Sequence, residues 1–387
     1  MKQILALLII FTSLLCAVAQ NNSVRIMYGP YLQNIDTNEA TITWVTDTPS
    51  VGWIELAHDG NDSFYNYERQ RYFDTTDGIK NISTIHSVTI KGLSSNTTYR
   101  YRTYAQAVVS HEGNRVMYGD YAATNVYSQE PLRFTTLCHE AEQVSFAVIN
   151  DIHGDNNRMS NLIAQCDLSA TDLFIFNGDM ASMYNSEEQI FGDFVSTAVS
   201  TFAGETPFYY TRGNHETRGS YAHKFHDYFS TGSSSLYYTF RQGPVLFVIL
   251  DSGEDKADSD IEYYGLVEYD NYRTRQAEWL EGVINSEAYR NAPLKVVVSH
   301  IPPMGDWHGN NEVKNKFVEV LRQAAPDIML CAHEHELIYS ESNSNTPFPI
   351  LINAHNTIVK VKATQSNMQI DVVDEKGKTI ATYNYSK

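Results

Sequence analysis

The chain has 387 residues, 42% of them hydrophobic, and a formal net charge of −18 at pH 7. This length and apolar content are enough for two packed domains and exclude a disordered protein. The acidic excess argues against nucleic acid and against an anionic membrane surface as partners, since both need a basic face. It does not exclude a small phosphate ester, because bound cations would reverse the local field.

The first 19 residues have the pattern of a secretory signal peptide. Lys2 supplies a short positive start, Ile4–Leu15 is apolar, and Ala17-Val18-Ala19 is a small-residue cleavage site. The apolar stretch is too short for a transmembrane helix, and no later stretch reaches the required length. Cys16 follows a leucine rather than the small residue that lipid anchoring normally needs. We therefore expect a secreted or periplasmic protein without a lipid anchor.

Three cysteines follow the predicted cleavage site: Cys138, Cys166 and Cys331. An odd number allows at most one disulfide within the chain, which excludes a scaffold built from disulfides. Cys331 lies in a predicted buried strand, and we expect it to be a small buried hydrophobe rather than a metal ligand.

Residues 20–138 are predicted to form an all-β sandwich. Short segments alternate apolar with small or polar residues, and Gly, Asn, Asp and Ser clusters separate them at sandwich-like intervals. The tyrosine-bearing segment 97–101 resembles a strand of fibronectin type III-like domains. The polar, Tyr-rich segment 110–127 is expected to be a long hairpin or loop, and 132–135 the last strand. The clearest alternating segments are 40–45, 87–90 and 99–104.

Residues 139–387 change to alternating strands and helices, which indicates an α/β domain with helices on the faces of a partly parallel sheet. A hairpin is predicted between 236–240 and 245–250. The tail after residue 350 returns to a β pattern. The predicted helices are 158–165, 187–201, 273–286 and 312–324, and the predicted tail strands are 350–353, 357–362, 368–373 and 379–385.

Five short polar clusters each follow an apolar run that is typical of a buried strand. In open α/β sheets, ligands bind at the carboxyl ends of the strands, so five such ends can converge on one site. The runs are 145–149, 172–176, 207–211, 294–298 and 327–331. The clusters are Asp151-Ile152-His153, Gly178-Asp179, Gly213-Asn214-His215-Glu216, His300 and His333-Glu334-His335.

The residue types in these clusters suit a pair of metal ions. Two metals about 4 Å apart can hold both the attacking and the leaving oxygen of a displacement at phosphorus. Asp151 and His153 are two residues apart, as are His333 and His335, so each pair can reach one ion from a strand end. One cluster alone would be weak support, because Gly-Asp and Gly-Asn are common turns. Five clusters in this order make a metal site the favoured interpretation.

In residue type and order, the clusters resemble those of the calcineurin-like metallophosphoesterase superfamily. The preceding β-domain makes the mature chain similar to purple acid phosphatases and their bacterial relatives. The resemblance implies a four-layer αββα domain after the sandwich, and two metal ions with Asp179 as the bridging ligand. The implied ligands of the first ion are Asp151, His153, Asp179 and His335. Those of the second are Asp179, Asn214, His300 and His333.

The resemblance also implies the reaction, in which hydroxide held by the two metals attacks the phosphorus of a phosphate monoester. His215 would not bind metal; it would stabilise charge on the substrate oxygens or protonate the leaving group. Arg212 would either contact the phosphate or pair with a carboxylate, and both alternatives stay open. Glu216 is expected to orient its neighbours. No phosphoenzyme is expected, because no nucleophilic side chain is needed.

Some positions depart from the resembling families. Position 153 is not usually His in purple acid phosphatases, and Ser182 stands where their iron-binding tyrosine would be. We therefore expect a Mn, Zn or Fe pair without a tyrosinate–iron centre. Ala332 stands where the last motif usually begins with Gly. The Asp-Arg-Gly element of Ser/Thr protein phosphatases is absent, which argues against that activity.

Residues near the clusters are weaker candidates. Trp307 and His308 could line the substrate pocket or lie on an exposed loop, and His355 could support the metal ligands from behind. The acidic, Tyr-rich segment 254–272 is a solvated insertion or a lid, with the insertion favoured.

Two other functions stay open on the sequence alone. A phosphodiesterase or nucleotide-cleaving enzyme would use the same metal pair, and the surrounding loops would decide between these and a monoesterase. A non-catalytic binding protein would use the sandwich to recognise a polymer or surface. The intact ligand set argues against the second alternative.

Overall fold

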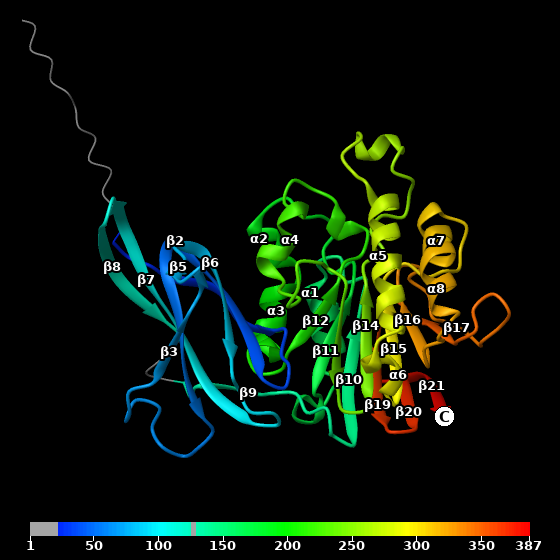
Figure 1. Ribbon diagram of the computed structural model, residues 1–387, viewed down its shortest axis with the longest axis horizontal. Helices are drawn as coiled ribbons and strands as arrows, with labels where there is room; N and C mark the ends of the chain where they lie inside the picture. The colour runs from blue at the N-terminus through cyan, green and yellow to red at the C-terminus, as the bar shows by residue number, and fades with distance from the viewer. Residues whose placement is uncertain (1–21, 125–128) are drawn as a thin grey trace, which may run out of the picture.

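A computed structural model describes residues 22–124 and 129–387 (Figure 1). The predicted signal peptide lies outside the described residues. Within those two ranges, no helix is both long enough and apolar enough to cross a bilayer. The chain forms a β-rich N-terminal part that lies beside an α/β part.

The N-terminal part is the predicted all-β sandwich. Its 20-residue strand β2 takes part in both faces, because its first half pairs with β1 and β6 and its second half with β3 and β7. The apolar side chains between the faces include Ile42, Trp44, Ile54, Tyr101 and Phe134. The strands are β1 (Ile26–Gln33), β2 (Glu39–His58), β3 (Gln70–Phe73), β6 (Ser83–Lys91), β7 (Thr98–Glu112), β8 (Arg115–Ala123) and β9 (Leu132–Thr135), with a separate small pair, β4 (Thr75–Thr76) and β5 (Ile79–Lys80).

The segment expected to be a hairpin or loop forms a hairpin, in which β7 continues to Glu112 and β8 returns from Arg115. The last strand, β9, pairs with the start of β7.

The α/β part contains two six-stranded sheets. The first has the order β12-β11-β10-β19-β20-β21, and the second β13-β14-β15-β16-β18-β17. The first-sheet strands are β10 (Gln143–Ile149), β11 (Leu173–Asn177), β12 (Phe208–Thr211), β19 (Thr357–Thr364), β20 (Asn367–Asp374) and β21 (Thr379–Ser386). The second-sheet strands are β13 (Tyr238–Gln242), β14 (Val245–Leu250), β15 (Leu294–Ser299), β16 (Ile328–Cys331), β17 (Ile338–Ser340) and β18 (Ile350–Ile352).

The two sheets pack face to face, and helices cover both outer faces. In β10, Phe146 points to the second sheet and meets Phe247 edge to face, whereas Ala147 and Ile149 point to the helices on the other side. This burial on both faces explains why the strands are continuous apolar runs. The result is the four-layer αββα arrangement implied by the family resemblance.

Helices of the first sheet are α1 (Asn156–Ile163), the continuous helical stretch from α2 (Glu187–Ile190) through α3 (Ser196–Ala198) to residue 203, and α4 (Phe225–Tyr228). Those of the second are α5 (Tyr269–Ile284), α6 (Glu287–Asn291), α7 (His308–Glu312) and α8 (Glu319–Leu321), the last two joined by helical turns. The predicted start of this last helical region at residue 312 is wrong. Its first turn begins at His308, and the Trp307 N–H donates to the Asn310 side chain at that end.

Tyrosine hydroxyls join the sandwich to the α/β part. Tyr101 donates to the carbonyl of Gly204 at 2.7 Å, and Tyr209 donates to the carbonyl of Ile35 at 2.7 Å. The sandwich therefore packs against the side of the α/β part that contains the first sheet and its helices, as Figure 1 shows.

Candidate metal centre

The five predicted clusters come from the carboxyl ends of parallel strands. Asp151 follows β10, Asp179 follows β11, and Asn214 follows β12, and these three strands are parallel neighbours in the first sheet. His300 and His333 follow β15 and β16, parallel neighbours in the second sheet. The polar loops of the two packed sheets therefore meet at one end of the domain.

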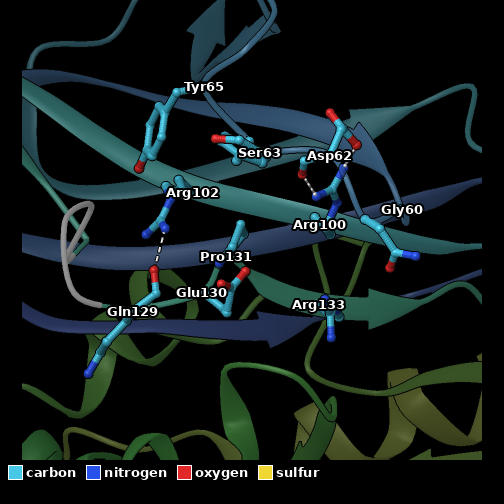
Figure 2. Close-up of a pocket in the computed structure, with 12 residues that line it drawn as sticks. Gly60, Asp62, Ser63, Tyr65, Arg100, Arg102, Gln129, Glu130, Pro131 and Arg133 are labelled. Atoms are coloured by element: carbon cyan, nitrogen blue, oxygen red, sulfur yellow. Dashed lines mark hydrogen bonds and ion pairs between the residues drawn. The ribbon is translucent and has the colours of Figure 1, made fainter.

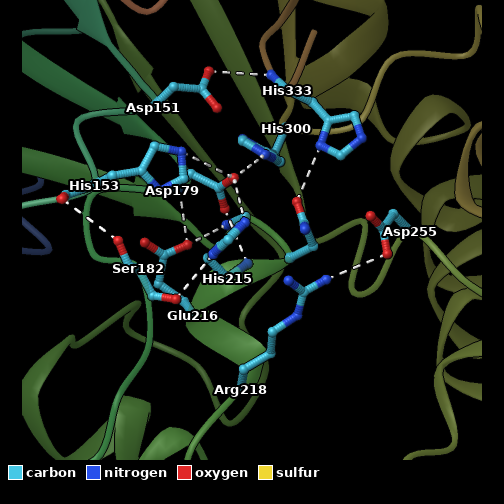
Figure 3. Close-up of polar contacts among 12 residues, drawn as sticks. Asp151, His153, Asp179, Ser182, His215, Glu216, Arg218, Asp255, His300 and His333 are labelled. Carbon is cyan, nitrogen blue, oxygen red and sulfur yellow. Dashed lines mark hydrogen bonds and ion pairs between the residues drawn. The ribbon is translucent and has the colours of Figure 1, made fainter. Parts of the chain in front are cut away.

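Asp179 lies at the centre of this cluster (Figure 3). One of its carboxylate oxygens, Oδ2, is 3.2 Å from His300 Nε2, 3.9 Å from His153 Nε2 and 4.0 Å from His215 Nε2. The other, Oδ1, accepts the backbone N–H of His215 at 3.0 Å. The carboxylate is thus within reach of two groups of ligand atoms at once.

The first group contains Asp151, His153 and His335. His335 Nε2 is 3.2 Å from Asp151 Oδ1 and 3.4 Å from His153 Nε2. The second group contains Asp179, His300 and His333, whose ligand atoms lie within 4.8 Å of one another. Asn214 Oδ1 is 3.0 Å from His333 Nδ1. The structure therefore brings all seven residues that were predicted as ligands into one cluster.

The cluster also passes a test of fit to metal ions. Among the described residues, Asp151 Oδ1 and His300 Nε2 are buried atoms without a well-aligned hydrogen bond, although each lies 3.2 Å from another predicted ligand. A buried polar atom without a partner costs free energy unless something else satisfies it. Carboxylate oxygen, amide oxygen and imidazole nitrogen are donors that Mn, Zn and Fe accept.

Second-layer contacts fix the orientation of these side chains. The Asn177 carbonyl lies 2.7 Å from His300 Nδ1, so this nitrogen can donate to it while Nε2 faces Asp179. The Glu216 carboxylate accepts the backbone N–H groups of Asp179, Ala181 and Gly213. This contact matches the predicted orienting role of Glu216.

Burial and charge act together on these groups. Burial, and then the nearby Asp179 carboxylate, raise the pKa of Glu216. Burial alone would lower the pKa of His300, but the Asp179 carboxylate raises it to about 10. Burial, and then the nearby His300, lower the pKa of His333 to about 4. Neutral imidazole is the form that binds metal, so His333 is ready as a ligand at neutral pH.

The backbone is strained at the same residues. Positive φ angles, which non-glycine residues rarely adopt, occur at Asp151 (52°), His153 (51°), Asp179 (53°), His333 (75°) and His335 (58°). Residues held in this region cost free energy and concentrate at functional sites.

Gly178 and Gly213 leave room for the cluster. A Cβ atom at Gly178 would lie 2.4 Å from His300 Nδ1, and one at Gly213 would lie 2.1 Å from Asp179 Oδ1. A side chain at either glycine would therefore collide with the cluster.

Comparison with known proteins agrees with this geometry. Residues 144–337, half of the chain, match the family model of calcineurin-like phosphoesterases. The chain belongs to the calcineurin-like phosphoesterase family. Members of this family use two metal ions, and residues 30–119 of this phosphoesterase match the purple acid phosphatase N-terminal domain.

Solved structures extend the likeness to both domains. A purple acid phosphatase from yellow lupin seeds has a TM-score of 0.67 at 14% identity, over 92% of this chain and 74% of that one. This identity level shows a shared fold alone. A calcineurin-like phosphoesterase from Bacillus subtilis has a TM-score of 0.36 at 11% identity, over 63% of this chain and 90% of that one. No curated protein matches the sequence.

Arg212 and His355, which were predicted outside the ligand set, both contact residues at or near the phosphoesterase centre. Arg212 donates from Nε and Nη2 to Asp251 Oδ2, at 2.9 and 2.7 Å, and both residues are buried. This geometry favours the carboxylate pairing over the phosphate contact. The ring of His355 contacts His335, and its Nδ1 is 3.2 Å from the His335 carbonyl, a position behind a predicted ligand.

Trp307 and His308 are not brought into the cluster of seven. Trp307 is 54% exposed. His308 Nε2 lies 2.7 Å from Asp270 Oδ1, beside Glu312, and Lys316 forms an ion pair with that glutamate. Cys331 is a buried free thiol, and burial raises its pKa, as expected for a structural residue.

The sequence analysis missed two supporting residues. Asn150 donates to Asp151 Oδ2 at 2.7 Å, and its position directly before the first ligand was an available signal. Arg218 pairs with Glu254 and Asp255, next to the His215 turn (Figure 3). Because these partners are more than 30 residues apart in the chain, no local spacing indicates the contact.

A separate cavity of about 710 Å³ lies on the sandwich (Figure 2). Its guanidinium groups are already engaged: Arg100 with Asp62, Arg102 with the Gln129 carbonyl, and Arg133 with Asp59. We therefore place the chemistry at the strand ends and not here.

Proposed function

We propose that this phosphoesterase is a dinuclear metal-dependent phosphomonoesterase that acts outside the cytoplasm, secreted or in the periplasm. Residues 139–387 would carry the reaction, and residues 20–138 would form the adjoining sandwich. The observation that carries the proposal is the position of Asp179, whose carboxylate is within reach of two groups of ligand atoms.

In the proposal, Asp151, His153, Asp179 and His335 hold one metal, and Asp179, Asn214, His300 and His333 hold the other. When bound, such a pair supplies Lewis acidity and lowers the pKa of a coordinated water. The distances among these side chains support the assignment. Distances alone would also allow His215 as a metal ligand, because its ligand atom lies within 4.8 Å of those of His153 and Asp179.

We assign His215 to the substrate instead. Its Nδ1 lies 2.9 Å from the Ser182 carbonyl, so it can donate there. This contact fixes the ring with Nε2 directed to the site, 4.0 Å from Asp179 Oδ2. The side chain is 31% exposed, so a substrate can reach it. In the imidazolium form both ring nitrogens carry a proton, so Nε2 can then stabilise charge on the phosphoryl oxygens and give its proton to the leaving oxygen.

The experiment compares hydrolysis of p-nitrophenyl phosphate and bis-p-nitrophenyl phosphate by metal-stripped protein that is resupplied with Mn, Zn or Fe. Metal-dependent turnover that favours the monoester supports the proposal and identifies the working ion. Preference for the diester would contradict the monoesterase assignment. No turnover of either ester, with two metals bound, would favour a non-catalytic binding protein.

A further inference from the structure

A cavity of about 1000 Å³ lies beside the His215 turn. Met183 and Thr217, which both line it, place it next to this turn. Met183 directly follows Ser182, whose carbonyl holds the His215 ring. Thr217 belongs to the same short helical turn as His215. The cavity therefore adjoins the turn that carries His215, and none of the predicted metal ligands lines it.

The opposite wall is the Tyr-rich segment 254–272, which rises above α5 in Figure 1. Tyr263, in the middle of the segment, is buried and donates to Glu254 Oε2 at 2.9 Å, and Glu254 pairs with Arg218 outside the segment. Towards the cavity it presents aromatic and aliphatic side chains. Leu266 is 89% exposed and Met183, across the cavity, is 39% exposed. Apolar groups held open to solvent at an enzyme cleft suit an apolar ligand.

The charges around the cavity do not favour an anionic occupant, because the cations are mostly paired. Arg218 is paired with Glu254 and Asp255, and Arg212 is paired with Asp251, so neither guanidinium carries an uncompensated charge. The rim adds Glu262, which pairs with Lys256, and Glu268, against the cation of Arg275. A second phosphate on the substrate would therefore meet no surplus of positive charge here.

We propose that this cavity holds the leaving group of the substrate, and that this group is an uncharged aromatic or apolar moiety larger than one benzene ring. The inference rests on the proposed phosphomonoesterase function and names its substrate class. His215 would lie between the phosphoryl group and the cavity. The ester oxygen would then lie next to the Nε2 proton, with the organic group directed towards Met183 and Leu266.

The test compares kcat/KM for 2-naphthyl phosphate and phenyl phosphate with the metal-loaded full-length protein. The first ester carries an additional fused ring for the cavity to contact. We expect the naphthyl-to-phenyl ratio to fall about fivefold in Leu266→Ser and in Met183→Ala, since each loses apolar contact area. Both side chains are exposed, so folding is not at risk. Ile380→Ser removes an equally apolar, 45% exposed side chain on β21 and serves as the matched control.

Each ratio is compared between variant and wild type, which cancels the intrinsic reactivity of the two esters. A lower ratio in both cavity variants, with the control unchanged, supports the proposal. Turnover of both esters with an unchanged ratio in the cavity variants overturns the cavity assignment alone. No turnover of either ester by the metal-loaded wild type overturns the phosphomonoesterase function, and the cavity assignment with it.

Discussion

Glu254 accepts two hydrogen bonds from the Arg218 guanidinium, at 2.9 Å from Nε and 2.8 Å from Nη2. It also accepts the Thr217 hydroxyl at 2.7 Å. Thr217 and Arg218 directly continue the turn that carries His215. A buried carboxylate from a distant segment thus fixes the position of the residue that we assign to the leaving group.

Replacing this carboxylate should disturb both stability and turnover. We expect Glu254→Gln to lower the free energy of unfolding by about 2 kcal/mol, because Arg218 loses a buried partner. We also expect kcat to fall about tenfold as the His215 turn loosens, while metal content stays unchanged. Urea unfolding, steady-state kinetics and metal analysis check these expectations. Glu319→Gln, which removes an exposed partner of Arg322, is the control and should change neither quantity.

The proposed bridging role of Asp179 predicts the largest loss of activity. Asp179→Asn should reduce metal content below two ions per chain and lower kcat/KM by on the order of a thousandfold, because amide oxygen is a poor bridging ligand. Metal analysis and p-nitrophenyl phosphate hydrolysis provide the measurement. Asp120→Asn changes an exposed carboxylate of β8 and should leave both values unchanged. Full activity in Asp179→Asn would disprove the two-metal mechanism.

His215 should behave differently from the ligands. His215→Ala should lower kcat about a hundredfold through loss of proton donation, with both metals still bound. Metal analysis beside steady-state kinetics makes this distinction. If the variant instead loses a metal, then His215 is a ligand, and the alternative grouping with His153 and Asp179 is correct.

The cost of close packing at Gly178 can be measured separately from the cost of its positive φ by comparison with Gly92. Gly178 and Gly92 have nearly the same positive φ, 80° and 78°, but only Gly92 has open space where a Cβ would lie. Gly92→Ala should therefore cost about 1 kcal/mol of stability from strain alone. Gly178→Ala should cost at least about 2 kcal/mol more and weaken metal binding, because the methyl group would strike His300. Thermal unfolding and metal titration of the two variants measure the difference.

A buried histidine makes the sandwich sensitive to acid. Burial lowers the pKa of His86 from 6.5 to about 4, so the folded protein binds this proton less readily than the unfolded chain. Its contribution to stability is therefore complete above pH 6.5 and is lost as pH falls towards 4, a change of about 3 kcal/mol. Urea unfolding between pH 4 and 7 should show this dependence of stability on pH in the wild type. It should also show it in His111→Gln, a control that replaces an exposed histidine. The dependence should be absent in His86→Gln, whatever that variant costs at neutral pH.

Much of the centre was predictable because the signal is local. Each ligand follows a short apolar run that is buried on both faces, and such a run fixes where the strand ends and the side chain emerges. Glu254 was not predictable as the partner of Arg218, since this contact depends on how a long insertion folds back. Nor does the sequence alone reveal that helix α7 begins at His308. The Asn310 side chain accepts the Trp307 N–H at that end, but in the sequence Asn310 is not distinguishable from an ordinary loop residue.

The positive φ angles at the five ligand positions limit how this protein can change. Glycine would relieve the strain at any of them, at about 1–3 kcal/mol each, but it would also delete a side chain that we assign to metal binding. Stability and the proposed chemistry therefore make opposite demands on the same positions. We expect a more thermostable variant of this protein to gain its stability elsewhere, in the cores or at the surface.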